Sequence, residues 1–107
     1  MDGGAEEGPM TTWRWVVEGR VQGVGFRYFT THAARSLGLR GWVRNRADGT
    51  VEIEVTGDAS AVARLRLRVE MGPPGAHVSR IEEEALNRQP LDPLTGQPVG
   101  EGFGTIR

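Results

Sequence analysis

The sequence predicts a single α+β domain whose elements follow the order strand, helix, strand, strand, helix, strand. Residues 12–18 and 50–56 indicate strands, because apolar and polar side chains alternate along them. Two further segments, one from Phe26 and one from about Ser60, repeat apolar residues with the period of a helix. This order is the split βαβ arrangement, in which an antiparallel sheet carries both helices on one face. We expect the other face of the sheet to be open to solvent.

Length and composition limit what the chain can be. Its 107 residues fit one domain, and 37% hydrophobic and 25% charged residues are ordinary for a globular protein. The net charge of −1 gives no overall attraction to nucleic acid or to an anionic membrane, and no apolar run approaches the ~20 residues of a membrane helix. The absence of cysteine excludes disulfides and cysteine-ligated metals, and two histidines make a histidine-rich metal site unfavourable. We expect a cytoplasmic protein that is monomeric at this size.

The first residues are predicted to be a disordered leader. Residues 1–11 are rich in glycine and acidic side chains and have neither the basic nor the apolar part of a secretion signal. The domain is therefore expected to span residues 12–107. It begins with a strand in which Trp13, Trp15 and Val17 share one face.

The run E-G-R-V-Q-G-V-G-F-R-Y (residues 18–28) predicts an anion-binding loop. Its three glycines precede a helical pattern, so the chain turns tightly and leaves several backbone N–H groups unpaired in one concavity. The helix dipole and the guanidinium of Arg27 add positive charge that suits a phosphate. The run lacks the Gly-Lys-Ser or Gly-Lys-Thr of nucleotide triphosphatases and the third glycine of the dinucleotide fingerprint. On its own, it is also compatible with an ordinary strand-to-helix turn.

The first helix is expected to begin at Phe26 and to be ended by Gly38, which fits a C-terminal cap. Arg27 lies about 100° from the apolar side of this helix, so it can face the loop while that side is buried. His32 also lies off the apolar side and is expected on the surface. The apolar stripe has the spacing i, i+3, i+7, i+11 and consists of Phe26, Phe29, Ala33 and Leu37.

A β-hairpin is predicted next, with strands at residues 42–46 and 50–56 joined by the turn signal Ala-Asp-Gly. In its second strand, three apolar residues alternate with Glu52, Glu54 and Thr56. One face of this strand should therefore be buried and the other exposed to water.

A second helix follows the hairpin. Asp58 or Ser60 can cap its N-terminus, and a Gly-Pro-Pro-Gly sequence ends it. Its apolar face consists of Val62, Leu65 and Val69.

The remaining chain is expected to add a strand, a loop and a short edge strand. Residues 77–85 predict the fourth strand, whose three consecutive glutamates point to alternate faces and cannot converge on one metal ion. Residues 87–102 are rich in proline and glycine and predict a mobile loop, and residues 103–107 predict the edge strand. The whole pattern is that of the ferredoxin-like fold.

The sequence offers no thiol and no convincing hydroxyl nucleophile, so any hydrolysis would use water as the attacker. Asn45 is a candidate to orient this water, because it is the one amide in its strand and a carboxamide both accepts and donates hydrogen bonds. Asparagine also favours turns, and Asn45 comes just before one. Both roles remain open from the residues alone.

Two segments together resemble the signature motifs of the acylphosphatases. These segments are G-R-V-Q-G-V-G-F-R (residues 19–27) and G-W-V-R-N-R-A-D-G-T-V (residues 41–51), and a single helix separates them. The resemblance covers residues 13–80 and extends to the closing edge strand. The leader and residues 87–102 depart from the family's pattern.

The resemblance implies a ferredoxin-like enzyme that hydrolyses acyl phosphates to a carboxylate and inorganic phosphate without a metal or other cofactor. Arg27 would match the family's phosphate-holding arginine, and Asn45 its water-orienting asparagine. The implied partners are a small acyl phosphate and the phosphate product, with neither nucleic acid nor membrane. The backbone cradle would be supplied by Gln22, Gly23, Val24, Gly25 and Phe26.

Two other functions are weighed against this one. Ferredoxin-like sheets can bind RNA on exposed aromatic residues, and Trp13, Trp15 and Trp42 lie in predicted strands, although the strand at residues 50–56 has no aromatic residue. The main alternative is a catalytically idle phosphate-binding or regulatory module of the same fold. Turnover of an acyl phosphate would distinguish the enzyme from both.

Overall fold

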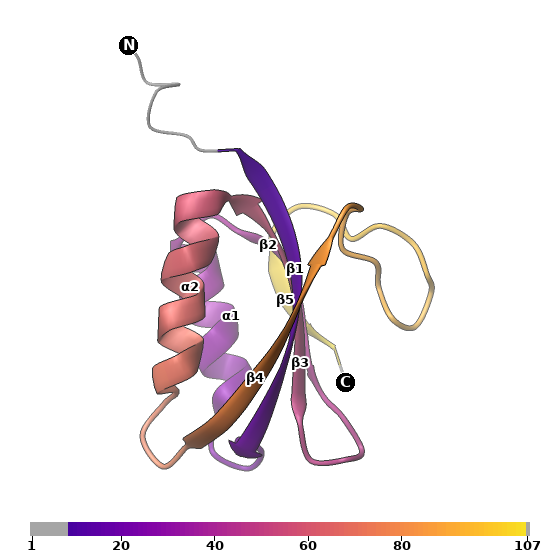
Figure 1. The fold of residues 1–107 in the computed structure, drawn as a ribbon. Helices are drawn as coiled ribbons and strands as arrows, with labels where there is room; N and C mark the ends of the chain where they lie inside the picture. The colour runs from indigo at the N-terminus through magenta and orange to yellow at the C-terminus, as the bar shows by residue number, and fades with distance from the viewer. Residues whose placement is uncertain (1–8, 107) are drawn as a thin grey trace.

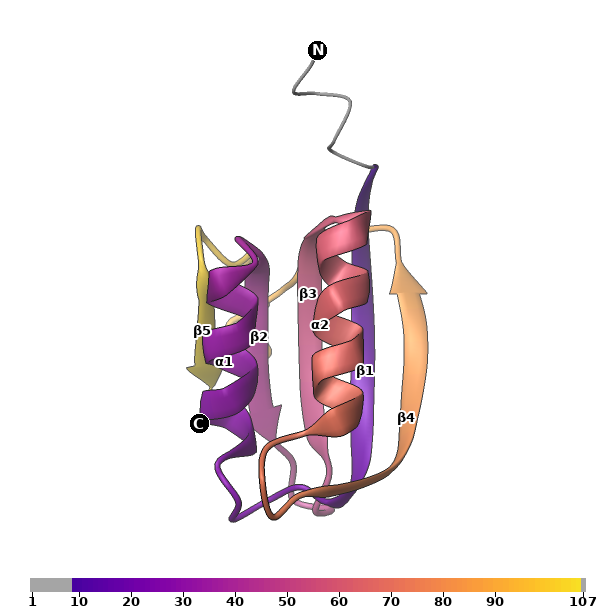
Figure 2. The same ribbon diagram turned by 90° about the vertical axis from the view of Figure 1, so that its left-hand side faces the viewer.

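The computed structural model describes residues 9–106 and confirms the predicted fold. Two helices cover one face of a single five-stranded sheet, as Figure 1 and Figure 2 show. The strand order in the sheet is β4-β1-β3-β2-β5. Of the expected leader, residues 1–8 lie outside the described residues. The elements are β1 (Met10–Arg20), α1 (Phe26–Ser36), β2 (Arg40–Asn45), β3 (Val51–Asp58), α2 (Ala59–Met71), β4 (His77–Leu86) and β5 (Phe103–Ile106).

The sheet is antiparallel except at one edge. β1 pairs with β3 and β4, and β2 pairs with β3, all in antiparallel register. The expected edge strand β5 is present and pairs parallel with β2, starting with Gly41 opposite Phe103. β1 begins two residues earlier than the strand pattern predicts, because Met10 and Thr11 continue the ladder to β3.

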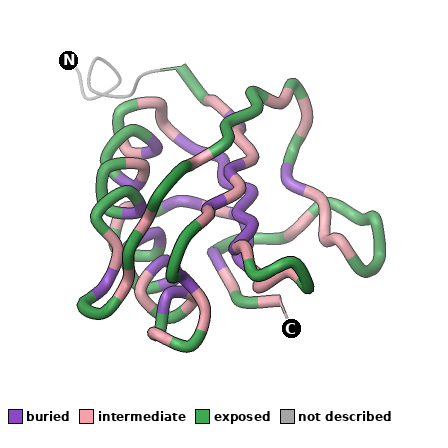
Figure 3. Tube along the Cα trace, turned by 60° about the horizontal axis from the view of Figure 1, so that its bottom comes forward, coloured by how far each residue is buried: buried purple, intermediate pink, exposed green. Residues whose placement is uncertain are grey.

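The core lies between the helices and the sheet, and Figure 3 shows the buried residues concentrated in the central strands and on the inner sides of the helices. The apolar residues predicted for β1 and β3 contribute to it, with Trp15 and Ile53 among the largest fully buried side chains. The stripe predicted for α1 is too narrow, since Thr30, Thr31 and Ala34 are buried beside Phe26 and Ala33. The helix is covered more broadly because it packs against β2, β5 and α2 at once.

The ends of α2 follow the sequence signals. The carboxylate of Asp58, rather than the hydroxyl of Ser60, caps the helix by accepting a hydrogen bond from the N–H of Ala61 at 3.2 Å. Gly72, with φ 69°, ends the helix in the conformation that glycine adopts readily. All three residues predicted for its apolar face are buried.

The second face of the sheet is only partly open to solvent, and the expectation of an open face was wrong around Glu54. Elsewhere on this face, the side chains of Arg14 and Glu84 are 33% and 60% exposed. Figure 1 shows that the chain after β4 folds back on the side of the sheet opposite the helices. Glu54, predicted to face water, is only 2% exposed. Its carboxylate accepts hydrogen bonds from the Arg88 guanidinium at 2.8 and 3.0 Å and from the N–H of Leu91 at 3.1 Å. Burial of this carboxylate is stabilised because cations and an N–H group surround it.

Residues 87–102 contain the expected long connection without a helix or a named strand, but it is docked onto the sheet. The indole N–H of Trp42 donates to the carbonyl oxygen of Leu91 at 2.8 Å. Within the segment, the N–H of Asp92 donates to Gln97 and the N–H of Gly96 donates back to Asp92, both at 2.8 Å. The segment therefore carries its own hydrogen-bonded turn and is joined to β2 and β3.

The three glutamates of β4 have three separate partners, in accordance with the alternation expected of a strand. The nearest nitrogen–oxygen distances in these ion pairs range from 2.7 to 3.1 Å. The pairs are Glu82 with Arg80, Glu83 with Arg66, and Glu84 with Arg14.

Candidate active site

The topology brings the two predicted motifs to the same end of the sheet. β1 and β2 lie on either side of β3 and both run antiparallel to it, so their carboxyl ends point the same way. Asn45, the last residue of β2, and Val17 of β1 flank the same residue of β3, Val51. Figure 2 shows the loop after β1 and the β2–β3 hairpin next to each other at the bottom of the molecule.

Arg27 and Asn45 line one pocket, which has a volume of about 540 Å³. The pocket also includes three residues of the predicted backbone cradle, Gly23, Gly25 and Phe26. The other lining residues are Val21, Tyr28, Thr31, Arg35 and Thr105.

The glycine loop presents backbone donors to this pocket. Gly23 and Gly25 have φ values of 76° and 78°, a left-handed conformation that other residues rarely adopt. Gly25 caps α1 without a side-chain hydrogen bond. Among residues 9–106, no backbone carbonyl outside α1 accepts a hydrogen bond from the N–H groups of Gly23 to Tyr28, and the first N–H groups of a helix have no partner within it. They belong to the loop and the first turn of α1, where the helix dipole is positive, so the loop can bind an anion.

Gln22 and Val24 are not among the residues that line the pocket, although both were predicted for the cradle. The side-chain amide of Gln22 instead donates to the carbonyl oxygens of Arg46 and Thr50, at 2.8 and 2.9 Å. Val24 packs partly buried against the hydrophobic core. The structure thus gives Gln22 a bracing role between the loop and the hairpin, which the sequence did not reveal.

The hairpin next to Asn45 is held by its own polar contacts. The carboxylate of Asp48 accepts hydrogen bonds from the hydroxyl and the N–H of Thr50, at 2.6 and 3.0 Å. These two hydrogen bonds, together with the charge of Arg46, hold the pKa of Asp48 below its usual value. The carboxylate therefore stays ionised and keeps the turn closed at neutral pH.

The pocket is positively charged. Two of its lining residues, Arg27 and Arg35, carry guanidinium groups, and none of them carries a carboxylate. Neither arginine forms an ion pair with a carboxylate of residues 9–106. An anion can approach these two cations without displacing an acidic side chain first.

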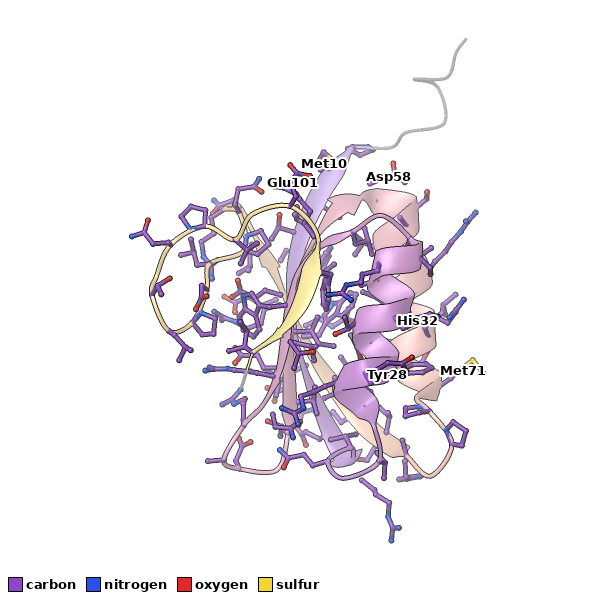
Figure 4. All side chains as sticks on the ribbon, turned by 180° about the vertical axis from the view of Figure 1, so that it is seen from behind. Met10, Tyr28, His32, Asp58, Met71 and Glu101 are labelled. Atoms are coloured by element: carbon purple, nitrogen blue, oxygen red, sulfur yellow. The ribbon has the colours of Figure 1, made fainter. Side chains whose placement is uncertain are left out.

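Five of the lining residues were not predicted, but a signal for two of them is present in the sequence. Thr31 and Arg35 follow Arg27 at intervals of four, so the three share one side of α1. Thr105 depends on the docking of β5 and has no local signal. Tyr28 is 76% exposed and stacks on the ring of His32, with centroids 6.0 Å apart. Figure 4 shows Tyr28 and His32 on the outer side of α1, where His32 was expected.

The described residues offer little for RNA binding or for a metal site. Trp15 and Trp42 are 1% and 2% exposed, so neither offers a surface on which an RNA base can stack. Among residues 9–106 there is no cluster of three or more histidine, aspartate and glutamate side chains that could hold a metal ion. None of the helices in this part of the chain is long and apolar enough to cross a membrane.

Comparison with known proteins identifies relatives of this chain. Residues 13–92 match the family model described as Acylphosphatase. The chain is 52% identical over 75 residues to an acylphosphatase of Cupriavidus pinatubonensis. This match covers 70% of this chain and 83% of the relative. It is 45% identical over 98 residues to an acylphosphatase of Synechococcus sp. WH7803, and this match covers 90% of this chain and 92% of the relative. The crystal structure of acylphosphatase from Bacillus subtilis superposes with a TM-score of 0.77 at 36% identity, covering 91% of this chain and 99% of that one.

Proposed function

The chain belongs to the acylphosphatase family and hydrolyses the carboxyl-phosphate bond of acyl phosphates, and from this premise we propose how its residues do so. Arg27 and the backbone N–H groups of the glycine loop hold the phosphoryl group. Asn45 orients the attacking water. The observation that carries the proposal is that Arg27 and Asn45, from different elements, line one pocket with the unpaired N–H groups of the loop.

Phosphoryl transfer depends mainly on positioning and on stabilising the charge of the equatorial oxygens. The N–H groups from Gly23 to Tyr28 and the guanidinium of Arg27 are donors that need no rearrangement to meet these oxygens. Bonds to charged oxygens are also stronger than bonds between neutral groups. The loop therefore supplies the electrostatic part of catalysis.

Asn45 supplies the positioning part. Its carboxamide accepts a hydrogen bond from water through its oxygen and has two N–H donors left to hold itself or the substrate. Attack requires the water opposite the leaving oxygen, roughly in line with phosphorus. Because Asn45 ends β2 beside a braced hairpin, its backbone is held in one place relative to the loop.

The chemistry of the leaving group explains why the site can work without an acid catalyst. The bond between the acyl oxygen and phosphorus breaks and releases a carboxylate, which is stable at neutral pH without protonation. A general acid at the leaving oxygen is therefore unnecessary. Phosphate monoesters release an alkoxide or a phenoxide instead, and such an acid helps because both are far more basic than a carboxylate. We expect weak activity on monoesters.

The test compares benzoyl phosphate with phenyl phosphate, with and without a chelator. We expect hydrolysis of benzoyl phosphate that the chelator does not reduce, and little hydrolysis of phenyl phosphate. A protein that binds phosphate but turns over neither compound would instead be the catalytically idle module. Loss of benzoyl phosphate hydrolysis on chelation would contradict the metal-free mechanism.

We further propose that the protein works as a cytoplasmic monomer. The chain has no cysteine, which suits a reducing compartment, and its 107 residues fit a single domain. Light scattering at micromolar concentration tests the oligomeric state, and a dimer mass would contradict it.

A further inference from the structure

We propose that Arg35 is a second anion contact, which selects acyl phosphates whose acyl group carries its own negative charge. The substrate class is the monophosphate of a dicarboxylic acid, with the phosphoryl group at Arg27 and the free carboxylate at Arg35. This inference rests on the proposed function, because the site of the phosphoryl group fixes the direction of the acyl chain.

The pocket extends along α1 away from the phosphate loop. Arg27, Thr31 and Arg35 occupy successive turns on one side of the helix, and all three line the pocket. Eight helical residues rise about 12 Å, so the two arginines lie at opposite ends of an elongated site. β5 forms its facing wall through Thr105, and Figure 2 shows α1 lying over β2 and β5.

The side chain of Arg35 is held in position. Its Nε–H donates to the carbonyl oxygen of Phe103 at 2.8 Å, which joins α1 to β5. The two terminal nitrogens of the guanidinium remain as donors for a ligand. Between the arginines, the hydroxyl groups of Thr31 and Thr105 lie 3.1 Å apart and form a neutral polar section of the wall.

Arg35 differs from two arginines on the other face of the sheet because it lacks a carboxylate partner among the described residues. Arg14 and Arg44 form ion pairs with Glu52, at 3.2 and 2.8 Å. Arg35 has no such pair among the described residues, and no carboxylate lines the pocket that it shares with Arg27. A second hollow bordered by Arg35 includes Glu101, which forms no ion pair with it. A carboxylate on the acyl group would meet an uncompensated cation that is fixed in direction.

The experiment uses pairs of acyl phosphates of equal length, one ending in a methyl group and the other in a carboxylate. Butyryl and succinyl phosphate are the shortest pair, and the series extends to about eight carbon atoms to cover the ~12 Å between the arginines. For each pair, the measured quantity is the ratio of kcat/KM for the charged substrate to kcat/KM for the uncharged one. We expect the ratio to rise with length and to reach only roughly three- to tenfold, because Arg35 is exposed to solvent.

Arg35→Gln should lower this ratio to about one at the length where the wild type has its maximum. The matched control is Arg64→Gln, which removes the same charge from an exposed position on α2 and should keep the wild-type ratio. If Arg35→Gln does not fold, the salt dependence of the wild-type ratio decides, since screening should lower it toward one.

The outcomes separate this inference from the proposed function. A ratio that Arg35→Gln leaves at its wild-type value, or that salt does not change, overturns the role of Arg35 while hydrolysis itself still supports the proposed function. A wild-type ratio of one or less at every length also overturns it. A protein that hydrolyses neither member of any pair fails the proposed function.

Discussion

The side-chain amide of Gln22 donates to the carbonyl oxygen of Arg46 at 2.8 Å, and so joins the glycine loop to the hairpin beside Asn45. Its second hydrogen bond, to Thr50, reaches the other side of the same hairpin at 2.9 Å. The pairing of β1 and β2 with β3 places the loop near the hairpin, and this one amide links the two directly. The relative position of Arg27 and Asn45 therefore depends on a residue whose side chain does not line the pocket.

Gln22→Ala should weaken both folding and catalysis. Two hydrogen bonds are lost, each contributing about 0.5–1.5 kcal/mol, so the free energy of unfolding should fall by about 1–3 kcal/mol. For a domain of this size, each kcal/mol lowers Tm by roughly 4 °C or more. Thermal unfolding and kcat with benzoyl phosphate measure the two effects. Gln97→Ala, in an exposed position, is the matched control, and a wild-type Tm and kcat for Gln22→Ala would contradict the bracing role.

Arg27→Ala should lose phosphate affinity and turnover together. In its proposed role the guanidinium binds the phosphoryl oxygens in both the ground state and the transition state, and loss of one such donor typically lowers the rate by about 10²–10³. Inhibition by inorganic phosphate and kcat with benzoyl phosphate measure the two losses. Arg20→Ala, an exposed arginine that precedes the loop and does not line the pocket, should change neither. Unchanged phosphate inhibition in Arg27→Ala would refute the phosphate-binding role.

Asn45→Ala should separate binding from turnover. Without the carboxamide the water is no longer oriented, so kcat should fall by about 10²–10³, whereas inhibition by phosphate should stay near the wild-type value. Asn45→Asp keeps the shape but adds a negative charge, and it should weaken phosphate inhibition as well. Near-normal turnover in Asn45→Ala would show that this side chain serves only the turn.

The stability of the fold should fall at acidic pH partly through Glu54. Burial raises the pKa of Glu54, but the hydrogen bonds from Arg88 and Leu91 and the charges of Arg88 and Arg14 outweigh burial, and its pKa lies below the usual value. A carboxyl with a lower pKa in the folded state stabilises the protein above its unfolded pKa and loses this contribution as pH falls through its folded pKa. The free energy of unfolding should therefore decline as pH drops below about 4.3.

Glu54→Gln should lower the free energy of unfolding at neutral pH by about 1–3 kcal/mol, because Arg88 loses its charged partner and Arg14 loses one of its three. It should also flatten the acid limb of the stability curve. Asp48→Asn is the comparison, since the pKa of Asp48 is lowered in the same direction from an exposed position. Urea unfolding measured between pH 3 and 7 gives the curves. If the free energy of unfolding of Glu54→Gln falls at low pH as steeply as that of the wild type, then other carboxylates cause the acid sensitivity.

Local patterns explain what could be predicted from the sequence. Strand alternation and helix period depend on neighbouring residues, and so do the glycines of the phosphate loop and the position of Asn45 before a turn. These signals predicted the fold and the two residues that line one pocket from different elements. Thr105 and the cover over Glu54 could not be predicted in this way. Each depends on which distant segment docks on the sheet, and alternation shows only that a face is polar.

The position of the parallel edge strand β5 suggests the order in which the two ends of the site form during folding. The glycine loop, α1 and the β2–β3 hairpin are close in sequence, whereas β5 joins β2 only across the long segment after β4. Contacts between residues far apart in sequence cost more loop entropy and tend to be established later. A folding chain should therefore form the proposed phosphate-binding part of the site first. The proposed selection between acyl groups would follow only after Thr105 and the carbonyl of Phe103 have docked against α1.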